Sequence, residues 1–479
     1  MDALEYHRAT KHTPESLRRT STPLDWANMP DPFRHYEGTP LIDLPADPSP
    51  PSLSALSVLA GLLGPQTGED EINFLSRLLF YSASISASKK TVSGYRYALR
   101  VNPSSGNLHP TEFHLASPQG LFHYRVSSHM LEQRAIGDFG DLSFLLTTIS
   151  WREAWKYGNR AYRYCLLDAG HAWQALELSS RALGFEAQAM GRFADDELAA
   201  YYSLPEDEWP LLVVRLKSDF TPSSSKAPEW IRGIPNKLSG ETGSNPAITS
   251  VHCKTKLTAG FAKARGDVLA PAAEPLSGMA YGGLFGEVVR RRRSALDFGG
   301  GFETIAADQL LTMLGLATRP LAADVLPHSY IDLYVYVHRV RGVDPGVYRY
   351  LREGNRLELL RIGDQRAAAA RLSLGQALAG NSCVTISMVA DFDRALGEAG
   401  DRGYRYVHFE AGAIGQRLYV AAEALGLQST GIGAFYDDLV HEYLGLKSEG
   451  RQVVYHFASG YAVADYRLVP TIADRDHEL

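Results

Sequence analysis

Alternation of apolar and other residues predicts a strand at a similar place in each half of the chain. Leu333, Val335 and Val337 stand at every second position of residues 331–337, which is the two-residue period of a strand. Residues 111–116 form the matching stretch nearer the N-terminus. Short aromatic stretches behind glycine turns, at 120–125 and 346–350, predict the next strand in each half.

A stripe of apolar and small residues predicts one long helix in each half. The first begins near Ala161 and the second near Gly403. Their stripes contain Leu166, Ala169, Gly170, Trp173 and Leu176 in one helix, and Phe409, Gly412, Ala413, Gln416 and Leu418 in the other. Such a stripe is typical of core packing. Its small residues would let two long helices approach closely.

The two helical regions are copies of one another. Residues 161–196 and 403–438 align without a gap at a constant offset of 242, with 14 of the 36 positions identical. The late strands at 211–214 and 453–457 also correspond, and near the starts Arg8-Ala9-Thr10 matches Arg292-Arg293-Ser294. The chain is therefore a duplication of a whole domain, not an array of short repeats.

Each half is predicted to run helices, strand, strand, long helix, second helix and strand, an α+β pattern. We expect an N-terminal domain over 1–217, a linker over 218–280 and a C-terminal domain over 281–479. Two homologous halves would pack as an intramolecular pseudo-dimer that buries the helix stripe. The chain could then be a monomer.

The predicted linker is rich in Ser, Pro, Gly and Ala and is long enough to cross a domain face. Apolar residues at Trp230, Ile231, Ile234 and Leu238 indicate that part of it packs. The proline-rich residues 14–52 predict an extended arm, either ordered or disordered.

The composition argues against several classes of protein. A net charge of −6 over 479 residues gives no overall electrostatic case for nucleic acid or an anionic membrane. Cys165, Cys253 and Cys383 lie far apart, which argues against a metal site or a disulfide framework and suits a reducing cytoplasm. No apolar run reaches the roughly 18 residues of a membrane span. We therefore expect a cytoplasmic protein.

Residues 102–110, NPSSGNLHP, form a turn directly before the strand at 111–116. Two prolines, a glycine and several small polar residues cannot continue a helix or central strand. The turn could be an ordinary surface loop, or a shaped loop that offers hydroxyl, amide and N–H groups to a flat polar ligand.

Two segments of the C-terminal half offer complementary chemistry. Arg292, Arg293 and Ser294 could grip a phosphate, because guanidinium groups bind it bidentately, or could belong to a basic helix face. Residues 431–435, GIGAF, could let main-chain N–H groups approach a planar ligand, or could form a plain turn between helices.

Together these residues resemble the nitroreductase superfamily of flavin proteins, and within it the SagB-type dehydrogenases, which oxidise azoline rings in ribosomal peptides. The resemblance covers nearly the whole chain as two modules. It implies FMN bound between the modules, with residues from both.

The resemblance implies a role for residues of each half. In the C-terminal half, the phosphate and ribityl chain would contact Arg292, Arg293 and Ser294, the ring would lie on Ile432, Gly433 and Ala434, and Arg467 would complete the phosphate site. In the N-terminal half, the flavin loop would comprise Arg100, Pro103, Ser104, Ser105, Gly106 and Asn107.

Each half lacks a different part of the flavin site that the resemblance implies. The C-terminal half has Val325-Leu326-Pro327-His328-Ser329 in place of the flavin loop, and the N-terminal half has Met190-Gly191-Arg192 in place of residues 432–434. We therefore expect one composite FMN site per chain.

The resemblance also assigns a catalytic pair, Lys156 and Tyr157, which in SagB-type azoline oxidases removes the substrate proton. At the offset of 242 the other half has Glu398 and Ala399, so the pair survives in one half. Without the resemblance, Lys156 would be a solvated helix charge and Tyr157 a core aromatic.

One position departs from the family pattern R-x-S-x-(R/K)-x-F, because Leu296 stands where a basic residue is expected. Another basic group, Arg100 or Arg96, must then face the pyrimidine side of the flavin, or the flavin potential is lower than usual.

The implied reaction is a dehydrogenation in which hydride passes between the substrate and FMN N5 while Lys156 handles the neighbouring proton. The substrate would be a small molecule or a modified peptide, and O2 or another acceptor would reoxidise the flavin. Two alternatives stay open: an NAD(P)H-dependent nitro or quinone reductase, and a non-catalytic flavin-binding partner subunit.

Overall fold

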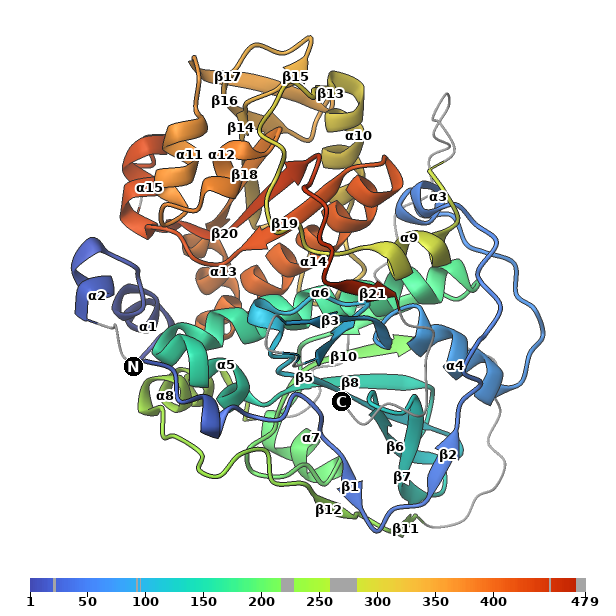
Figure 1. Ribbon diagram of the computed structural model, residues 1–479. Coiled ribbons are helices and arrows are strands. Elements are labelled where there is room, and N and C mark those ends of the chain that lie inside the picture. The colour runs from blue at the N-terminus through green and yellow to red at the C-terminus, as the bar shows by residue number, and fades with distance from the viewer. Residues whose placement is uncertain are drawn as a thin grey trace.

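The computed structural model describes residues 1–19, 23–91, 94, 96–216, 228–258, 282–447 and 449–470. Two β-sheets lie at opposite ends of the molecule, with two long central helices between them (Figure 1). We call residues up to 258 the N-terminal half and residues 282–470 the C-terminal half. The boundaries predicted at 217/218 and 280/281 lie outside the described residues.

The sheet of the N-terminal half has the strand order β11-β7-β6-β5-β8-β10-β9, and β2 also pairs with β7. Its strands are antiparallel. Their bounds are β2 Leu41–Asp43, β5 Thr111–Ser117, β6 Gly120–Arg125, β7 Met130–Ile136, β8 Ser143–Thr148, β9 Ala187–Met190, β10 Trp209–Leu216 and β11 Glu229–Trp230.

The sheet of the C-terminal half repeats this order as β17-β16-β14-β18-β20-β19, again antiparallel. Its strands are β14 Ile331–Val337, β16 Gly346–Leu351, β17 Arg356–Ile362, β18 Val384–Asp391, β19 Gln428–Ile432 and β20 Arg451–Gly460. The strands predicted at 111–116 and 331–337 thus occupy equivalent central positions.

The helices repeat at the offset of 242 found in the sequence. The pairs are α5 Ser150–Tyr157 with α13 Phe392–Ala399, η3 Gly158–Arg160 with η4 Gly400–Arg402, α6 Ala161–Ala182 with α14 Gly403–Ala424, and α7 Asp195–Tyr201 with α15 Asp437–Leu444. The predicted α+β fold and the duplication are confirmed.

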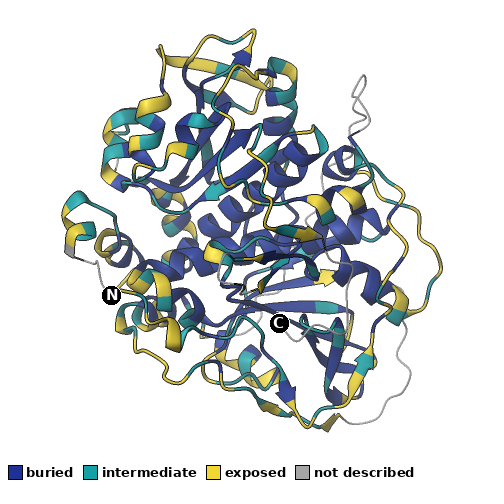
Figure 2. Ribbon diagram, in the orientation of Figure 1, coloured by how far each residue is buried: buried dark blue, intermediate teal, exposed yellow. Residues whose placement is uncertain are grey.

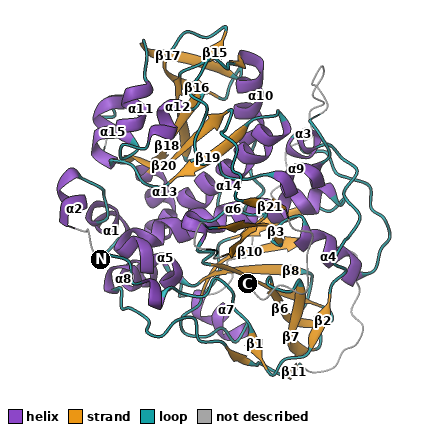
Figure 3. Ribbon diagram, in the orientation of Figure 1, coloured by secondary structure: helices purple, strands orange, loops and turns teal. Residues whose placement is uncertain are grey.

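The central helices α6 and α14 cross at two equivalent glycines. A Cβ on Gly170 would lie 2.3 Å from the Phe409 carbonyl oxygen, and one on Gly412 would lie 2.1 Å from the Leu167 carbonyl oxygen. Both helices are buried almost throughout (Figure 2) and separate the two sheets (Figure 3). The halves therefore pack as the predicted pseudo-dimer.

Two equivalent buried carboxylates join the halves. Asp437 accepts from Arg160 at 2.9 Å and from Arg163 at 2.7 Å. At the same offset, Asp195 accepts from Arg402 at 2.6 Å and from Arg405 at 2.7 Å. The repeated Arg-x-x-Arg and Asp-Asp motifs of the alignment are thus structural contacts across the pseudo-dimer.

Each end of the described chain crosses to the opposite half. The N-terminal helix α1, Ala3–Ala9, contacts the C-terminal half, where the His7 ring lies 3.2 Å from Gln452 Oε1. Conversely, β21 Leu468–Pro470 pairs with β3 Ile85–Lys90, which pairs with β4 Arg96–Arg100. A small sheet of the N-terminal half is therefore completed by the last described strand.

The described part of the predicted linker folds onto the N-terminal half. β11 pairs with β7, β12 Ile234–Pro235 pairs with β1 Tyr36–Glu37, and α8 Pro246–Thr255 follows. Among the predicted packing residues, Leu238 is buried and Ile234 is exposed.

The other elements are α2 Pro14–Arg19, η1 Trp26–Asn28, α3 Ala55–Leu59, α4 Glu71–Phe80, η2 Ser105–Asn107, α9 Phe285–Arg291, β13 Ile305–Ala306, α10 Ala307–Ala317, β15 Val340–Arg341, α11 Arg366–Leu372 and α12 Ala377–Asn381. Over the part of the chain that the structure describes, no helix has the length and apolar character needed to cross a membrane.

Candidate functional site

A cavity of about 340 Å³ lies between the two halves, within the range of small-molecule and cofactor sites. The N-terminal half contributes Lys89, Tyr97, Leu99, Arg100, Asn102, Pro103, Ser104, Ser105, Gly106, Asn107, His109, Tyr157, Tyr164, Asp168 and His171. The C-terminal half contributes Arg292, Arg293, Ser294, Gln376, Tyr419, Thr430, Gly431, Ile432, Gly433, Ala434 and Tyr455. The structure thus gathers every predicted site residue around one cavity except Lys156 and Arg467.

The loop that follows β4 is shaped by left-handed backbone. Gly106 has φ 60°, Asn107 φ 61° and His109 φ 50°, a region that glycine and asparagine tolerate best. The Asn107 side-chain amide donates to the Ala98 carbonyl at 2.9 Å. These features turn the predicted loop back towards β4 and into the cavity wall.

Asp168 on α6 anchors this loop. Ser104 Oγ donates to it at 2.7 Å, Ser105 Oγ at 2.9 Å and the Ser105 N–H at 3.0 Å. Burial raises the pKa of Asp168 to about 7, although these donors oppose the rise. Sequence reasoning missed Asp168, but the retained acid at its counterpart, Glu410, was a usable signal.

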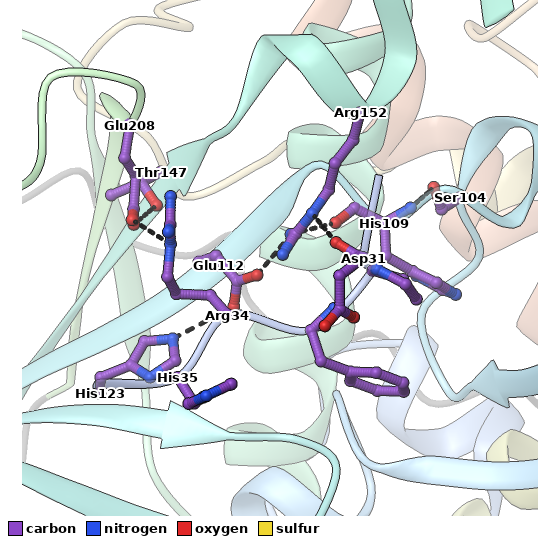
Figure 4. Close-up of polar contacts among 12 residues, drawn as sticks. Asp31, Arg34, His35, Ser104, His109, Glu112, His123, Thr147, Arg152 and Glu208 are labelled. Carbon is purple, nitrogen blue, oxygen red and sulfur yellow. Dashed lines mark hydrogen bonds and ion pairs between the residues drawn. The ribbon is translucent and has the colours of Figure 1, made fainter. Parts of the chain in front are cut away.

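A buried ionic network supports the loop from the other side (Figure 4). Arg152 donates to the His109 carbonyl at 2.8 Å and pairs with Glu112. Glu112 also contacts the His123 ring at 3.1 Å. Although burial opposes ionisation, Arg152 and His123 lower the pKa of Glu112 to about 2. The His109 N–H reaches Ser104 Oγ at 2.8 Å, which joins the network to the loop.

Two buried arginines of the cavity wall keep donors free. Arg292 donates to the Val101 and Arg100 carbonyls at 3.1 and 3.2 Å, while its Nη1 has no hydrogen-bond partner among the described residues. Arg100 donates through Nη2 to Pro32, and its Nε and Nη1 have no partner there either. Because unpaired buried donors are costly, these arginines fit an anionic or acceptor-rich ligand.

Arg293 lies beside Arg292, and both lie close to Arg290. Burial, followed by Arg292 and Arg290, lowers the pKa of Arg293 to about 9. Clustered guanidinium groups repel one another, so an anion between them would relieve the repulsion. Next to them, Ser294 Oγ lies 2.8 Å from the Tyr419 hydroxyl, which accepts from the Gly431 N–H at 2.9 Å.

The glycines at 431 and 433 have no room for a side chain. A Cβ on Gly431 would lie 1.9 Å from the Tyr455 hydroxyl, and one on Gly433 would lie 2.3 Å from Tyr164 Cε1. The Gly433 carbonyl accepts from the Tyr164 hydroxyl at 3.1 Å. This backbone is therefore held across the pseudo-dimer interface, where it lines the cavity.

The predicted catalytic pair lies next to the flavin-loop glycine. A Cβ on Gly106 would lie 2.5 Å from the Tyr157 hydroxyl and 3.1 Å from Lys156 Nζ. Lys156 is exposed, whereas Tyr157 is half-buried and lines the cavity. Burial raises the pKa of Tyr157 well above its usual range, so the phenol is neutral at neutral pH.

Arg467 does not join the cavity wall. Asp465, two residues earlier, accepts from its guanidinium at 2.8 Å, and the side chain is largely exposed. Lys89, which sequence reasoning missed, lines the cavity instead. Of the two basic groups considered as substitutes at Leu296, Arg100 lines the cavity, whereas Arg96 is exposed and does not.

A second, much smaller cavity of about 20 Å³ also lies between the halves. Its lining includes Val58, Leu59, Gly61, Leu178, Arg181, Arg319, Pro320, Ala322 and Arg417. Arg417 donates to Gln174 and to the Arg319 carbonyl, both at 2.7 Å, and Arg181 pairs with Glu177 at 2.5 Å. Glu177 is the counterpart of Tyr419.

The proposed equivalence of Arg8-Ala9-Thr10 with Arg292-Arg293-Ser294 is wrong. Arg8 is exposed and pairs with Glu449 of the other half. The element that faces α9 across the pseudo-dimer is α3, since Ser54 bridges to Leu284. Leucines, not arginines, follow α3 at positions 62 and 63, so this segment lacks a phosphate-binding motif.

Comparison with known proteins decides the family. The profile of the nitroreductase family matches residues 86–216 and 331–461. The chain belongs to the nitroreductase family. The two matches lie one in each half and together cover more than half of the chain, so the duplicated unit is the family's domain.

Two relatives show how far the similarity extends. A Methanocaldococcus jannaschii protein named "Putative nitroreductase" is 36% identical over 135 residues, which are 28% of this chain and 66% of that protein. A crystal structure of a "putative nitroreductase" from Anabaena variabilis is 26% identical, with a TM-score of 0.76, and covers 97% of this chain and 100% of its own. The second relative shares the full two-domain arrangement.

Proposed function

We propose that this nitroreductase-family protein is an FMN-dependent oxidoreductase with one composite site per chain. The observation that carries the proposal is that the cavity between the halves has buried guanidinium donors without a partner among the described residues, whereas Leu62 and Leu63 stand where the other half has Arg292 and Arg293. A single flavin per chain follows from that difference.

The residues present fit FMN. Arg292, Arg293 and Ser294 would hold the phosphate and ribityl chain, and the backbone at 432–434 would lie along the ring edge. Arg100 would serve the pyrimidine side in place of a base at Leu296, because its unpaired donors are buried in the same wall. When bound, FMN supplies two-electron chemistry through hydride exchange at N5.

We propose a SagB-type dehydrogenation, in which Lys156 and Tyr157 handle the substrate proton. Lys156 Nζ lies close to both the flavin loop and solvent, so it could first release its own proton to water and then take the substrate proton at the cavity. Tyr157, whose phenol stays neutral, would donate a hydrogen bond that orients the substrate. The substrate would be a small molecule or a modified peptide, and O2 would reoxidise the flavin; in the alternative reductase reaction, NAD(P)H would reduce it.

The first test is the flavin content of the purified protein, measured after release and quantified per chain. About one FMN per chain supports the composite site, and two would contradict it. No binding even in excess FMN would favour a partner-subunit role.

Anaerobic mixing with NADH or NADPH then separates the two catalytic alternatives. Fast bleaching of the flavin absorption, followed by reoxidation with a quinone or nitroaromatic, would favour the reductase. Slow bleaching by both nucleotides supports the dehydrogenase.

A further inference from the structure

A second carboxyl group lies behind the flavin loop and takes no part in the proposed chemistry. Glu153 is on α5, one helical turn before Lys156, and is fully buried. Neither of its carboxyl oxygens has a hydrogen-bond partner among the described residues. An ionised carboxylate in such a place would be costly, since no donor among the described residues meets its oxygens at hydrogen-bond distance.

Ser104 explains why Glu153 is left unpaired. Its hydroxyl lies near both acids but has one proton to donate, and that proton goes to Asp168 at 2.7 Å. Asp168 meets donors at both of its oxygens, including the Ser105 N–H and hydroxyl. An ionised carboxylate accepts from such a set best. The hydrogen-bond pattern therefore places the negative charge on Asp168 and a proton on Glu153.

The surrounding charges agree with this assignment. Burial, and then Asp168, raises the pKa of Glu153 well above its usual range, and Lys156 opposes that rise. The other titratable groups that face the two acids are Cys165, Tyr157 and Tyr455, and burial raises the pKa of each. These three groups are neutral at neutral pH, and among the described residues the basic side chain that faces Glu153 is Lys156.

The C-terminal half balances its equivalent acid in another way. Glu410, the counterpart of Asp168, accepts from Ser329 and from the Tyr330 N–H. Arg352 lies 3.8 Å from its carboxylate, and the counterpart of Glu153 is Ala395. One half thus places an arginine beside its loop-anchoring acid, although burial still raises the pKa of Glu410, whereas the other half places a second acid there.

We propose that Glu153 and Asp168 share one proton, carried by Glu153, and that this pair sets the pH range in which the Ser104–Ser105 loop holds the cofactor. Glu153 is a positioning residue that acts through Asp168 and the loop. The part that concerns the cofactor rests on the proposed function; the shared proton does not.

The shared proton is tested on cofactor-free protein by urea unfolding between pH 4 and pH 9, comparing wild type with Glu153→Gln. A buried acid with a raised pKa keeps its proton in the folded state, while the unfolded chain loses it above the usual carboxyl range. Stability therefore falls as pH rises. The unfolding equilibrium constant of wild type should rise relative to the variant by up to about tenfold per pH unit. If the unfolding free energies of wild type and Glu153→Gln changed in parallel with pH, the proposal would be overturned.

The matched control is Glu410→Gln, at the acid of the C-terminal half that corresponds to Asp168. Burial raises the pKa of Glu410 as well, although Arg352 opposes the rise, so Glu410→Gln should depart from wild type over a narrower pH range than Glu153→Gln. An equal departure in both variants would show a general effect of removing a buried acid and would overturn the pair.

The cofactor part is tested by FMN titration over the same pH range, followed by flavin fluorescence quenching. Wild-type affinity should weaken at high pH, as the second carboxyl ionises, and Glu153→Gln should be flat. Asp168→Asn should weaken binding above about pH 7, where the Asp168 carboxyl is ionised and the Ser105 N–H has a charged acceptor to lose. Divergent unfolding profiles without any FMN binding would reject the proposed function and keep the proton pair, whereas FMN binding with equal pH dependence would reject the pair's role in the loop.

Discussion

The two cavities between the halves differ in what meets their arginines. In the larger cavity, Arg292 is buried, and its Nη1 has no partner among the residues that the structure describes. In the smaller one, Glu177 pairs with Arg181 and lies 3.8 Å from Arg417. Glu177, the counterpart of Tyr419, thus supplies an intrachain anion to Arg181, whereas Arg292 Nη1 has no partner among the described residues.

The contacts that hold the halves together are more alike in the two copies than the cavity linings are. Asp195 and Asp437 each bind two arginines at matched positions, and Gly170 and Gly412 meet at the helix crossing. Interface packing constrains both copies, whereas ligand binding constrains the copy that still binds. Variants made in matched pairs should therefore separate interface residues from site residues.

The largest difference is expected between Lys156→Ala and Glu398→Ala. Loss of the base should slow flavin bleaching by a substrate whose proton must be removed by roughly 10²–10⁴-fold, while bleaching by NADH, which needs no base, should be unchanged. Glu398, the exposed counterpart of Lys156, should alter neither rate. If both variants slowed flavin bleaching by the substrate equally, Lys156 would not be the base.

Asp437→Asn and Asp195→Asn should each destabilise the fold by about 3–5 kcal/mol in urea unfolding, because each leaves two buried arginines without their anion. Only Asp437→Asn should also weaken FMN binding, since Arg160 donates to the Gly433 carbonyl at 3.3 Å.

The Asp437 effect should depend on pH. Although burial opposes ionisation, Arg160 and Arg163 lower the pKa of Asp437 to about 2. A lowered pKa contributes stability above the unfolded value of about 3.9 that is lost as pH falls towards the folded value. The gap between wild type and Asp437→Asn should therefore narrow between about pH 4 and pH 2. A constant gap would contradict an ionised Asp437.

Arg292→Ala should weaken FMN binding by roughly 100-fold, because hydrogen bonds to charged groups contribute about 1.5–3 kcal/mol each. Arg319→Ala, in the lining of the smaller cavity, is the matched control and should leave the affinity unchanged. Equilibrium titration of cofactor-free protein measures both, with circular dichroism to verify folding. A comparable loss in Arg319→Ala would mean that the smaller cavity also contributes to binding.

Leu296→Lys should have the smallest effect. Leu296 is 44% exposed and does not line the cavity, so a lysine there should change stability by less than about 0.5 kcal/mol and leave the flavin midpoint potential at its wild-type value. A clear rise in potential would show that the missing base, and not Arg100, determines the charge near the ring.

The sequence repeat predicted much of this fold, because the offset of 242 shows which helices correspond. The small residues Gly170 and Gly412 predicted the close approach of the two long helices. Sequence comparison fails where the two copies diverge, because α3 and α9 share little sequence. It therefore matches Arg8 with Arg292, whereas the segment equivalent to α9 follows Ser54. Strand exchange by β21 was also beyond reach, because three residues carry no pairing signal.

The site could be predicted where it depends on short motifs, such as residues 102–107 and 292–294. Glu153, Lys89 and Tyr455 were missed because each is a single residue on an element with an ordinary pattern, and only tertiary packing brings them to the cavity or its support. Arg467 was assigned by its late position in the chain, but the nearby Asp465 holds it away from the cavity.

The crossing of the chain ends has a consequence for synthesis. β21 is the last described strand, yet it pairs with β3, whose Lys89 belongs to the cavity wall of the other half. Domains generally fold from the N-terminus while the ribosome is still at work. The nascent N-terminal half therefore cannot complete this wall by itself, because β3 pairs with β21 of the other half. A chain truncated before β21 should leave the wall that contains Lys89 incomplete.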